Sequence, residues 1–246
     1  MAFARRATAE VADSRYLVTS LSPRSVVGEA YRILRTNLQF LSLDKPLRHL
    51  VVTSAVPGEG KTLTAANLAV VEAQAGKKVI AVDADLRRPA LHRRFELPGN
   101  TGLTTWLAGG AQLPDMLQPT VLPNLHLLAS GPIPPNPAEL LGSSRMQELM
   151  AQLSDAADLI IWDTPPAIVV SDASVLATRA DGTLLVVRAA QEPYFSVKRA
   201  KEQLQQVGAR ILGVVLDAVP SGGGSDYYHS HYHYYYYYGG QHRKKR

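Results

Sequence analysis

A glycine-rich segment that ends in a lysine and a threonine carries the strongest chemical signal in the sequence. It reads AVPGEGKT from Ala55 to Thr62, with alanine where glycine is usual, and lies between an apolar run and a helical pattern. Such segments bind phosphate through backbone N–H groups and the lysine, and the hydroxyl ligates Mg²⁺. The sequence therefore predicts a nucleotide site with Mg²⁺. The residues expected to contact the nucleotide in this segment are Pro57, Gly58, Glu59, Gly60, Lys61, Thr62 and Leu63.

Carboxylates follow two further apolar runs of the chain. Asp83 and Asp85 come after VIAV, and Asp163 comes after LIIW. Ligands of open α/β sheets bind at the carboxyl ends of the strands, so these acids are expected beside the phosphates. A single aspartate after a strand is often only a turn former or a helix cap, and Asp172 has that simpler interpretation. Two acidic strand ends together with the glycine-rich loop favour a Mg²⁺–nucleotide site.

The elements that must position these residues alternate along the chain. Strands are expected at 50–53, 79–82, 126–129, 159–162, 183–187 and 211–216, and helices at 26–40, 61–75, 137–153, 171–179 and 196–207. Continuous apolar strands separated by helices indicate a mostly parallel sheet that is covered on both faces. The expected fold class is therefore α/β, of the P-loop NTPase type.

Length and composition exclude several other classes of protein. The chain has 246 residues, of which 46% are apolar and 19% are charged, so one folded domain is expected and a mostly disordered chain is excluded. No cysteine is present, which rules out disulfides and thiolate chemistry. No apolar run approaches the roughly 20 residues of a membrane-spanning helix, and the N-terminus has no signal-peptide pattern. A cytoplasmic protein is expected.

The positive charge of the chain is concentrated at its C-terminus. The net charge is +5, and Arg243, Lys244, Lys245 and Arg246 contribute four of these charges. The basic end could touch anionic lipid or nucleic acid, but a solvated tail is the simpler interpretation, and no nucleic-acid partner is expected.

The last part of the sequence has low complexity. We expect a loose arm at residues 1–16, a folded domain at 17–220 and a flexible tail at 221–246. Alternating histidines (His229, His231 and His233) and His242 could bind Zn²⁺ or Ni²⁺, although plain polar spacing is the simpler interpretation. Eight of the 11 tyrosines of the chain lie in the tail, namely Tyr227, Tyr228, Tyr232, Tyr234, Tyr235, Tyr236, Tyr237 and Tyr238.

Together these motifs resemble the bacterial tyrosine autokinases of capsular and exopolysaccharide synthesis. The resemblance extends from about Leu17 to the tail, and its motifs are SAVPGEGKT, VDADLRRP, GPIPPNPAELL, LIIWDTPP and the tyrosine cluster. It implies a kinase that uses ATP and Mg²⁺ to phosphorylate the tail tyrosines of a neighbouring copy in a ring-like homo-oligomer. The implied partners are a membrane-embedded polysaccharide co-polymerase, which recruits the kinase to the inner face of the membrane, and a tyrosine phosphatase.

The resemblance also gives roles to residues outside the glycine-rich loop. The segment EAYRILRTNL contains the ExxRxxR pattern, which implies that Glu29, Arg32 and Arg35 make oligomer contacts. The alternative is an exposed ion-pair face within one helix. Asp217 ends a GVVLD run where the family usually has asparagine, and it would accept a hydrogen bond from the exocyclic amine of adenine.

For phosphoryl transfer, we assign Lys61 to the β and γ phosphates. Thr62, Asp85 and Asp163 are the expected metal ligands. Either Asp83 or Asp85 would accept the proton of the tyrosine hydroxyl. Two residues that follow, Arg87 and Arg88, could stabilise phosphates or hold the loop, or they could form a solvated surface pair.

Two other functions remain open at this point. One is a septum- or plasmid-positioning ATPase of related fold, but such proteins have a signature lysine at the second position of the loop, where this chain has Val56. The other is a nucleotide-gated scaffold without catalysis. Lys61, Asp83, Asp85 and Asp163 favour catalysis.

Overall fold

The computed structural model describes residue 17 and residues 25–189 and 194–219. The expected arm at residues 1–16 lies outside these ranges. The tail at residues 221–246, with all of its tyrosines and histidines, also lies outside them.

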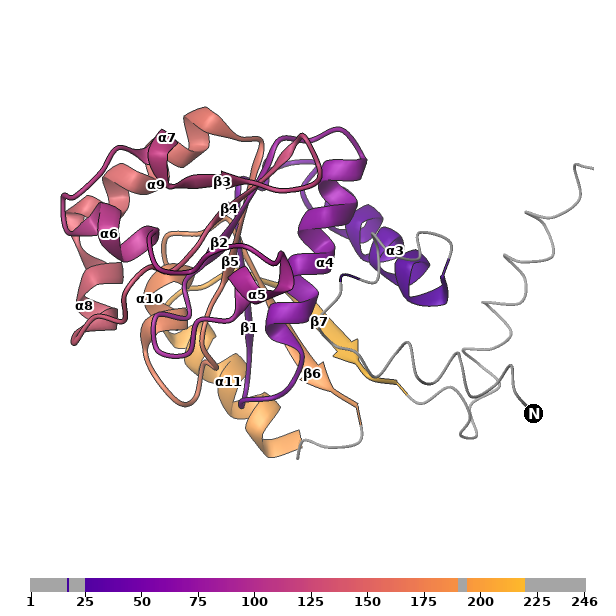
Figure 1. Cartoon of the computed structure of the whole chain (residues 1–246). Helices are drawn as coiled ribbons and strands as arrows, with labels where there is room; N and C mark the ends of the chain where they lie inside the picture. Colours follow the sequence, from indigo (N-terminus) through magenta and orange to yellow (C-terminus); the bar gives the residue numbers. More distant parts are fainter. Residues whose placement is uncertain (1–16, 18–24, 190–193, 220–246) are drawn as a thin grey trace, which may run out of the picture.

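A seven-stranded sheet runs through the middle of the molecule (Figure 1). The strand order is β3-β4-β2-β5-β1-β6-β7, and all neighbours are parallel except β3, which runs antiparallel to β4. This arrangement confirms the expected α/β fold with a mostly parallel sheet. The strands are His49–Ser54 (β1), Val79–Asp83 (β2), Leu117–Pro119 (β3), Leu125–Leu128 (β4), Leu159–Asp163 (β5), Gly182–Arg188 (β6) and Ile211–Asp217 (β7).

The three central strands are mostly apolar because both faces of the sheet are covered. Every residue of β1, β2 and β5 is buried. Figure 1 shows α3 and α4 on one side of the sheet and α6, α8 and α9 on the other. Neighbouring residues of one strand accordingly belong to different cores, since Val52 packs with α4 whereas Val51 packs with α9. This double burial leaves only the strand ends open to ligands.

The helices include several that the sequence did not predict. Three short helices, α5 to α7, follow β2, and the expected helix at 137–153 is two helices. Its break falls at Ser143, whose hydroxyl caps α9 by accepting a hydrogen bond from the N–H of Met146. The helices are Val26–Leu41 (α3), Lys61–Gln74 (α4), Leu91–Arg94 (α5), Leu103–Leu107 (α6), Leu113–Met116 (α7), Pro137–Gly142 (α8), Ser144–Ala156 (α9), Asp172–Ala177 (α10) and Tyr194–Gln206 (α11).

Helix α4 lies over the middle of the sheet, on the same face as α3. Ten of its 14 residues are buried, and it contacts β1, β2, β4 and β5. Because α4 begins at Lys61, the end of the glycine-rich loop is fixed to a helix that is buried from Thr64 to Ala73. None of the helices within the described ranges is both long and apolar enough to cross a lipid bilayer.

Candidate active site

The glycine-rich loop connects the carboxyl end of β1 to the first turn of α4. Gly58 has φ 88° and Gly60 has φ 90°, a left-handed conformation that glycine adopts without strain. The N–H of Val56 donates to the Glu59 carboxylate at 2.8 Å, and the hydroxyl of Ser54 donates to the carbonyl of Val56 at 2.8 Å. The loop is therefore held in shape by its own side chains, as a preformed phosphate site requires.

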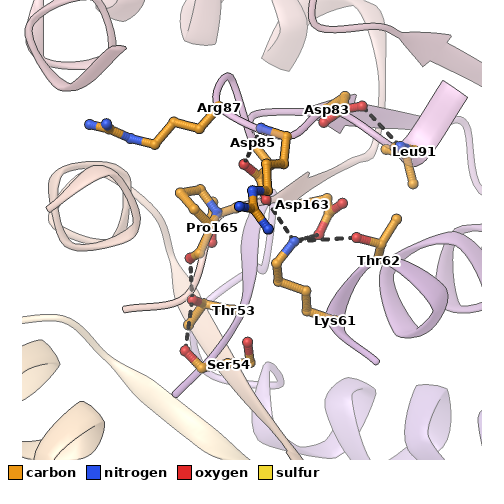
Figure 2. A network of polar contacts seen from close by, with 12 residues as sticks. Thr53, Ser54, Lys61, Thr62, Asp83, Asp85, Arg87, Leu91, Asp163 and Pro165 are labelled. Carbon is orange, nitrogen blue, oxygen red and sulfur yellow. Dashed lines mark hydrogen bonds and ion pairs between the residues drawn. The ribbon is translucent and has the colours of Figure 1, made fainter. Parts of the chain in front are cut away.

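The Lys61 ammonium lies between two of the predicted acids (Figure 2). Its Nζ is 2.8 Å from Oδ2 of Asp85 and 3.7 Å from Oδ1 of Asp163, and it donates to Oγ1 of Thr62 at 3.3 Å. These residues come from the start of α4, the segment after β2 and the end of β5. The structure thus brings together groups that the sequence had predicted to meet.

The two acids of the VDAD segment have different surroundings. Asp83 is opposite Asp163 in the pairing of β2 with β5, and both are fully buried. Asp83 accepts the N–H of Leu91 at 2.9 Å, and its carboxylate lies 3.7 Å from Nδ1 of His92. Asp85 instead faces Lys61. Asp83 therefore holds the start of α5, whereas Asp85 forms an ion pair with Lys61.

Burial of several charges in one place shifts the pKa values of the site. Burial raises the pKa of Asp163 to about 7, the Lys61 ammonium opposes this shift, and the carboxylates of Asp83 and Asp85 add to it. Burial by itself would lower the pKa of Lys61, but the carboxylates of Asp163 and Asp85 outweigh that effect and raise it. The lysine is therefore held in its charged form, whereas the Asp163 carboxyl takes up a proton more readily than an exposed aspartate.

The donor atoms around Lys61 suit Mg²⁺. Both carboxylate oxygens of Asp163 and Oδ1 of Asp83 are buried without a hydrogen-bond partner among the described residues. Together with the hydroxyl of Thr62, they are the hard oxygen donors that Mg²⁺ prefers. No group of three or more acidic, histidine or cysteine side chains in the described ranges forms a metal cage by itself. This donor set fits an ion that is shared with substrate phosphates.

An ion pair that the sequence did not predict holds the segment after β2 in place. The Arg87 guanidinium donates from Nε to Oδ2 of Asp172 at 2.9 Å and from Nη2 to Oδ1 at 3.1 Å. Asp172 is fully buried at the start of α10. In Figure 2 the side chain of Arg87 points away from Lys61. Of the roles considered for Arg87, holding the loop is the one that the contacts support, and the exposed Arg88 donates its N–H to Asp85.

The carboxylate of Asp217 lies against Gly60 of the glycine-rich loop. Asp217 ends β7, and a Cβ added at Gly60 would collide with its carboxylate. Arg188, its register partner on β6, donates from Nη1 to the carbonyl of Gly58 at 3.3 Å. The sequence predicted that Asp217 contacts the base, and its position beside the loop is compatible with that prediction but does not test it.

The ExxRxxR helix is only partly an exposed ion-pair face. Nε of Arg32 is 2.9 Å from Oε2 of Glu29 in the same helix. Arg35 instead reaches α4, where Nη1 donates to the carbonyl of Val71 at 3.1 Å. An oligomer contact through Glu29, Arg32 and Arg35 stays a prediction.

Comparison with known sequences gives a consistent set of relatives. The CobQ/CobB/MinD/ParA nucleotide binding domain matches residues 50–232. Tyrosine-protein kinase YwqD of Bacillus subtilis is 43% identical over 203 residues, which is 82% of this chain and 86% of the relative. Tyrosine-protein kinase CpsD of Streptococcus agalactiae is 36% identical over 211 residues, or 85% of this chain and 89% of the relative.

Solved structures give the same result. The chimerical protein CapA2B2 has a TM-score of 0.81 at 38% identity, covering 83% of this chain and 90% of that one. The kinase domain of the Escherichia coli tyrosine kinase ETK has a TM-score of 0.78 at 34% identity, covering 86% and 84%. The septum site-determining protein MinD of Pyrococcus horikoshii, complexed with Mg-ADP, has a TM-score of 0.59 at 27% identity and covers 69% of both chains. The similarity is thus greater to the kinases than to the positioning ATPase.

Proposed function

Because the chain belongs to the bacterial tyrosine-protein kinases of capsule and exopolysaccharide synthesis, we propose that it transfers the γ-phosphoryl group of ATP to its own C-terminal tyrosines. The acceptors are the eight tyrosines between Tyr227 and Tyr238, supplied by a neighbouring copy. The observation that carries the proposal is the convergence of Lys61 with Asp85 and Asp163 at the carboxyl ends of β2 and β5.

The glycine-rich loop and α4 bind the phosphates of ATP. The N–H groups at the start of α4 and the Lys61 ammonium attract the negative charge of the β and γ phosphates. Thr62 and Asp163 hold Mg²⁺, which, when bound, neutralises charge on the phosphate oxygens. Asp217 accepts a hydrogen bond from the adenine amine. The oxygens of Asp163 have no hydrogen-bond partner among the described residues, although Oδ1 is 3.7 Å from Lys61, and this supports a role as a metal ligand.

Asp85 is the better of the two candidates for the group that accepts the tyrosine proton. Asp83 is turned toward Leu91 and His92 at the start of α5, whereas Asp85, although also buried, faces the Lys61 ammonium that is assigned to the phosphates. As the phenol oxygen bonds to phosphorus and the bond to ADP breaks, the phenol proton passes to the Asp85 carboxylate. A phenol with a pKa of about 10 needs only late proton removal, so a carboxylate is an adequate base.

The kinase acts as a homo-oligomer at the inner face of the membrane. The ion pair of Glu29 and Arg32 lies at the surface of α3, where the Glu29 side chain is 52% exposed, so this face of the helix is accessible to a neighbouring copy. A membrane-embedded polysaccharide co-polymerase recruits the oligomer, and a tyrosine phosphatase resets it. In this way phosphorylation regulates polysaccharide polymerisation and export.

Mixing two inactive forms with different defects tests the proposal directly. The Lys61→Met variant keeps its tyrosines but loses the phosphate contact, and a variant with all eight tail tyrosines changed to Phe keeps the site but has no acceptor. Each alone with ATP and Mg²⁺ should give no phosphotyrosine in the tail. In the mixture, the tail of the Lys61→Met chain should become labelled. A tail that stays unlabelled while wild type labels fully would contradict transfer between copies, and labelling of Lys61→Met alone would contradict the assignment of Lys61.

A further inference from the structure

A shallow apolar groove of about 420 Å³ lies between α6, α8 and the loop that follows β4. Figure 1 shows α6 and α8 at the left of the molecule. One wall of the groove is the segment Pro132-Ile-Pro-Pro135, and its lining includes no charged residue. The Ile133 side chain is 64% exposed at this wall. An apolar surface of this kind is suited to bind apolar or aromatic side chains.

The proline wall is rigid before anything binds to it. The hydroxyl of Thr104 shares its one hydrogen between the carbonyls of Ser130, at 3.0 Å, and Pro132, at 2.8 Å. The N–H of Leu103 donates to the carbonyl of Ala129 at 2.8 Å. Proline has a fixed φ and little conformational entropy to lose. A ligand that binds here therefore avoids most of the entropy cost of ordering the protein surface.

The groove lies at the same edge of the sheet as the active site. The loop that forms the proline wall follows β4, whose parallel neighbour β2 leads to Asp83 and Asp85. From β4 to the glycine-rich loop after β1 there are three strand spacings, because the order is β4-β2-β5-β1. At about 4.8 Å per spacing, the groove begins on the order of 15 Å from the phosphate site.

We propose that this groove binds the tyrosine-rich segment 227–238 of the chain while another tyrosine of the same segment occupies the active site. The proposal rests on the proposed function and names a second binding site for its substrate. Tyrosine rings can pack against the prolines and Ile133 while their hydroxyls stay in water at the rim. Aromatic side chains packed on prolines are a recurrent mode of peptide recognition.

The spacing of the tyrosines fits the distance between the two sites. Tyr228 and Tyr234 are six residues apart, which is about 20 Å in an extended chain. The segment is also long enough to reach the groove. From Val219, the last residue described, eight residues lead to Tyr227 and 19 to Tyr238, or about 26 to 65 Å when extended.

The groove distinguishes unmodified from modified tyrosines. A phosphotyrosine carries about −1.5 to −2 charge, and bringing this charge to the rim of an apolar groove whose lining includes no cationic residue costs part of its hydration. Unmodified tyrosines are therefore retained in the groove while phosphorylated ones leave. This keeps the remaining acceptors of the segment close to the active site until most of them are modified.

Photo-crosslinking of the full chain tests the occupant of the groove. Benzoylphenylalanine in place of Ile133 should crosslink to peptides of residues 222–241, as identified by mass spectrometry. The control carries the same group at Val121, which is 92% exposed and precedes β4, at the opposite edge of the sheet. A crosslinked product of doubled mass on a denaturing gel shows that the bound segment comes from a neighbouring copy. A product of unchanged mass shows that it comes from the same copy. Crosslinks from position 133 that reach only other regions, or equal tail crosslinking from position 121, would overturn the proposal.

A charge substitution tests whether the groove contributes to catalysis. Ile133→Glu should slow phosphorylation of the tail about fivefold to tenfold, because it places a charge among apolar contacts, while the affinity for ADP stays as in wild type. Val121→Glu should label at the wild-type rate. Wild-type labelling by Ile133→Glu would contradict the proposal. If wild type itself does not label, the proposed function fails, but crosslinking of the tail to position 133 would still support binding of the segment.

Discussion

The guanidinium of Arg87 donates two hydrogen bonds, of 2.9 and 3.1 Å, to the fully buried carboxylate of Asp172. This pair joins the segment after β2, which carries Asp85, to the start of α10. Asp172 is 85 residues away from Arg87 in sequence, and within the described part of the chain no hydrogen bond or ion pair joins it to the glycine-rich loop. The position of Asp85 beside Lys61 therefore depends on a helix outside the site.

Removing Arg87 should lower both stability and activity. Arg87→Ala leaves the Asp172 carboxylate buried without its partner, which should cost about 1–3 kcal/mol, less than for a fully buried pair because the Arg87 side chain is 41% exposed. The phosphorylation rate should fall as well, since Asp85 loses its support. Urea unfolding and initial rates measure the two effects. Arg88→Ala, which removes an exposed neighbouring side chain, is the matched control and should unfold like wild type.

Much of the site could be predicted from the sequence because its main residues follow continuous apolar runs. Parallel strands that are buried on both faces appear in the sequence as continuous apolar runs. These runs predicted where β2 and β5 end, and with them the positions of Asp83 and Asp163. Lys61 and Thr62 have a fixed spacing to the glycines of their loop. Local pattern and motif spacing therefore sufficed for these groups.

The remaining features depend on contacts that sequence spacing does not record. The helices α5 to α7 have four or five residues, about one turn each, which is too short for a helical period to be recognised. The three residues of β3 are likewise too few. Arg35 was grouped with Arg32 because they are three residues apart, yet it contacts the carbonyl of Val71 on α4. Such pairings arise only when the elements pack.

The two acids after β2 should differ in how much they matter for catalysis. Asp85→Asn should reduce the initial rate of tail phosphorylation about 100-fold or more, because the amide can neither accept the proton nor pair with Lys61. Asp83→Asn retains an oxygen that can accept the N–H of Leu91, so we expect a smaller loss, of about tenfold. Equal losses in both variants, with nucleotide affinity unchanged, would argue against Asp85 as the base.

His49 should make the stability of the fold depend on pH. Its Nδ1 accepts the indole N–H of Trp162 at 3.2 Å, its Nε2 is 2.7 Å from the Ser154 hydroxyl, and burial lowers its pKa from 6.5. A folded-state pKa below the unfolded value means that the neutral ring stabilises the protein above pH 6.5. As the pH falls from 6.5 to the lowered pKa of the folded state, the unfolded chain takes up a proton at this histidine and the folded protein does not. The contribution to stability is lost over that range.

Urea unfolding at a series of pH values, followed by Trp162 emission in a Trp106→Phe background, measures this effect. The free energy of unfolding should fall more steeply below pH 6.5 in the protein with His49 than in the His49→Asn variant. Parallel pH profiles for the two proteins would show that His49 does not contribute.

The oligomer prediction needs a variant that leaves the fold of the single chain intact. Arg35 binds the Val71 carbonyl within its own chain, so its removal would disturb α3 and α4 as well as any contact between copies. The double variant Glu29→Ala, Arg32→Ala removes the ion pair at the surface of α3 and leaves the contact of Arg35 with α4 in place. Light scattering should detect a monomer with an unchanged melting temperature. If this variant keeps the oligomer of wild type, the pair is only an intrahelical ion pair.

Phosphorylation of the tail should dissolve the oligomer. Modification of four of the eight tyrosines adds roughly −6 to −8 charge, which exceeds the +4 of the basic end, so the sign of the segment is reversed. A neutral tyrosine can lie beside the acidic groups of the site. A dianionic phosphotyrosine is repelled there by Asp83, Asp85 and the phosphates of the nucleotide. Unmodified tails therefore favour association of the copies, and modified tails favour release.

Light scattering of wild type before and after incubation with ATP and Mg²⁺ measures this change, and the variant with all eight tail tyrosines changed to Phe is the control. Wild type should shift from oligomer to monomer as it becomes labelled, whereas the Phe variant should stay associated under the same conditions. Since the repulsion is electrostatic, the shift should weaken at high salt, where exposed charges are screened over a few ångströms. A fully phosphorylated protein that remains oligomeric at physiological salt would contradict the charge-reversal mechanism and favour a role of the tail in docking other proteins.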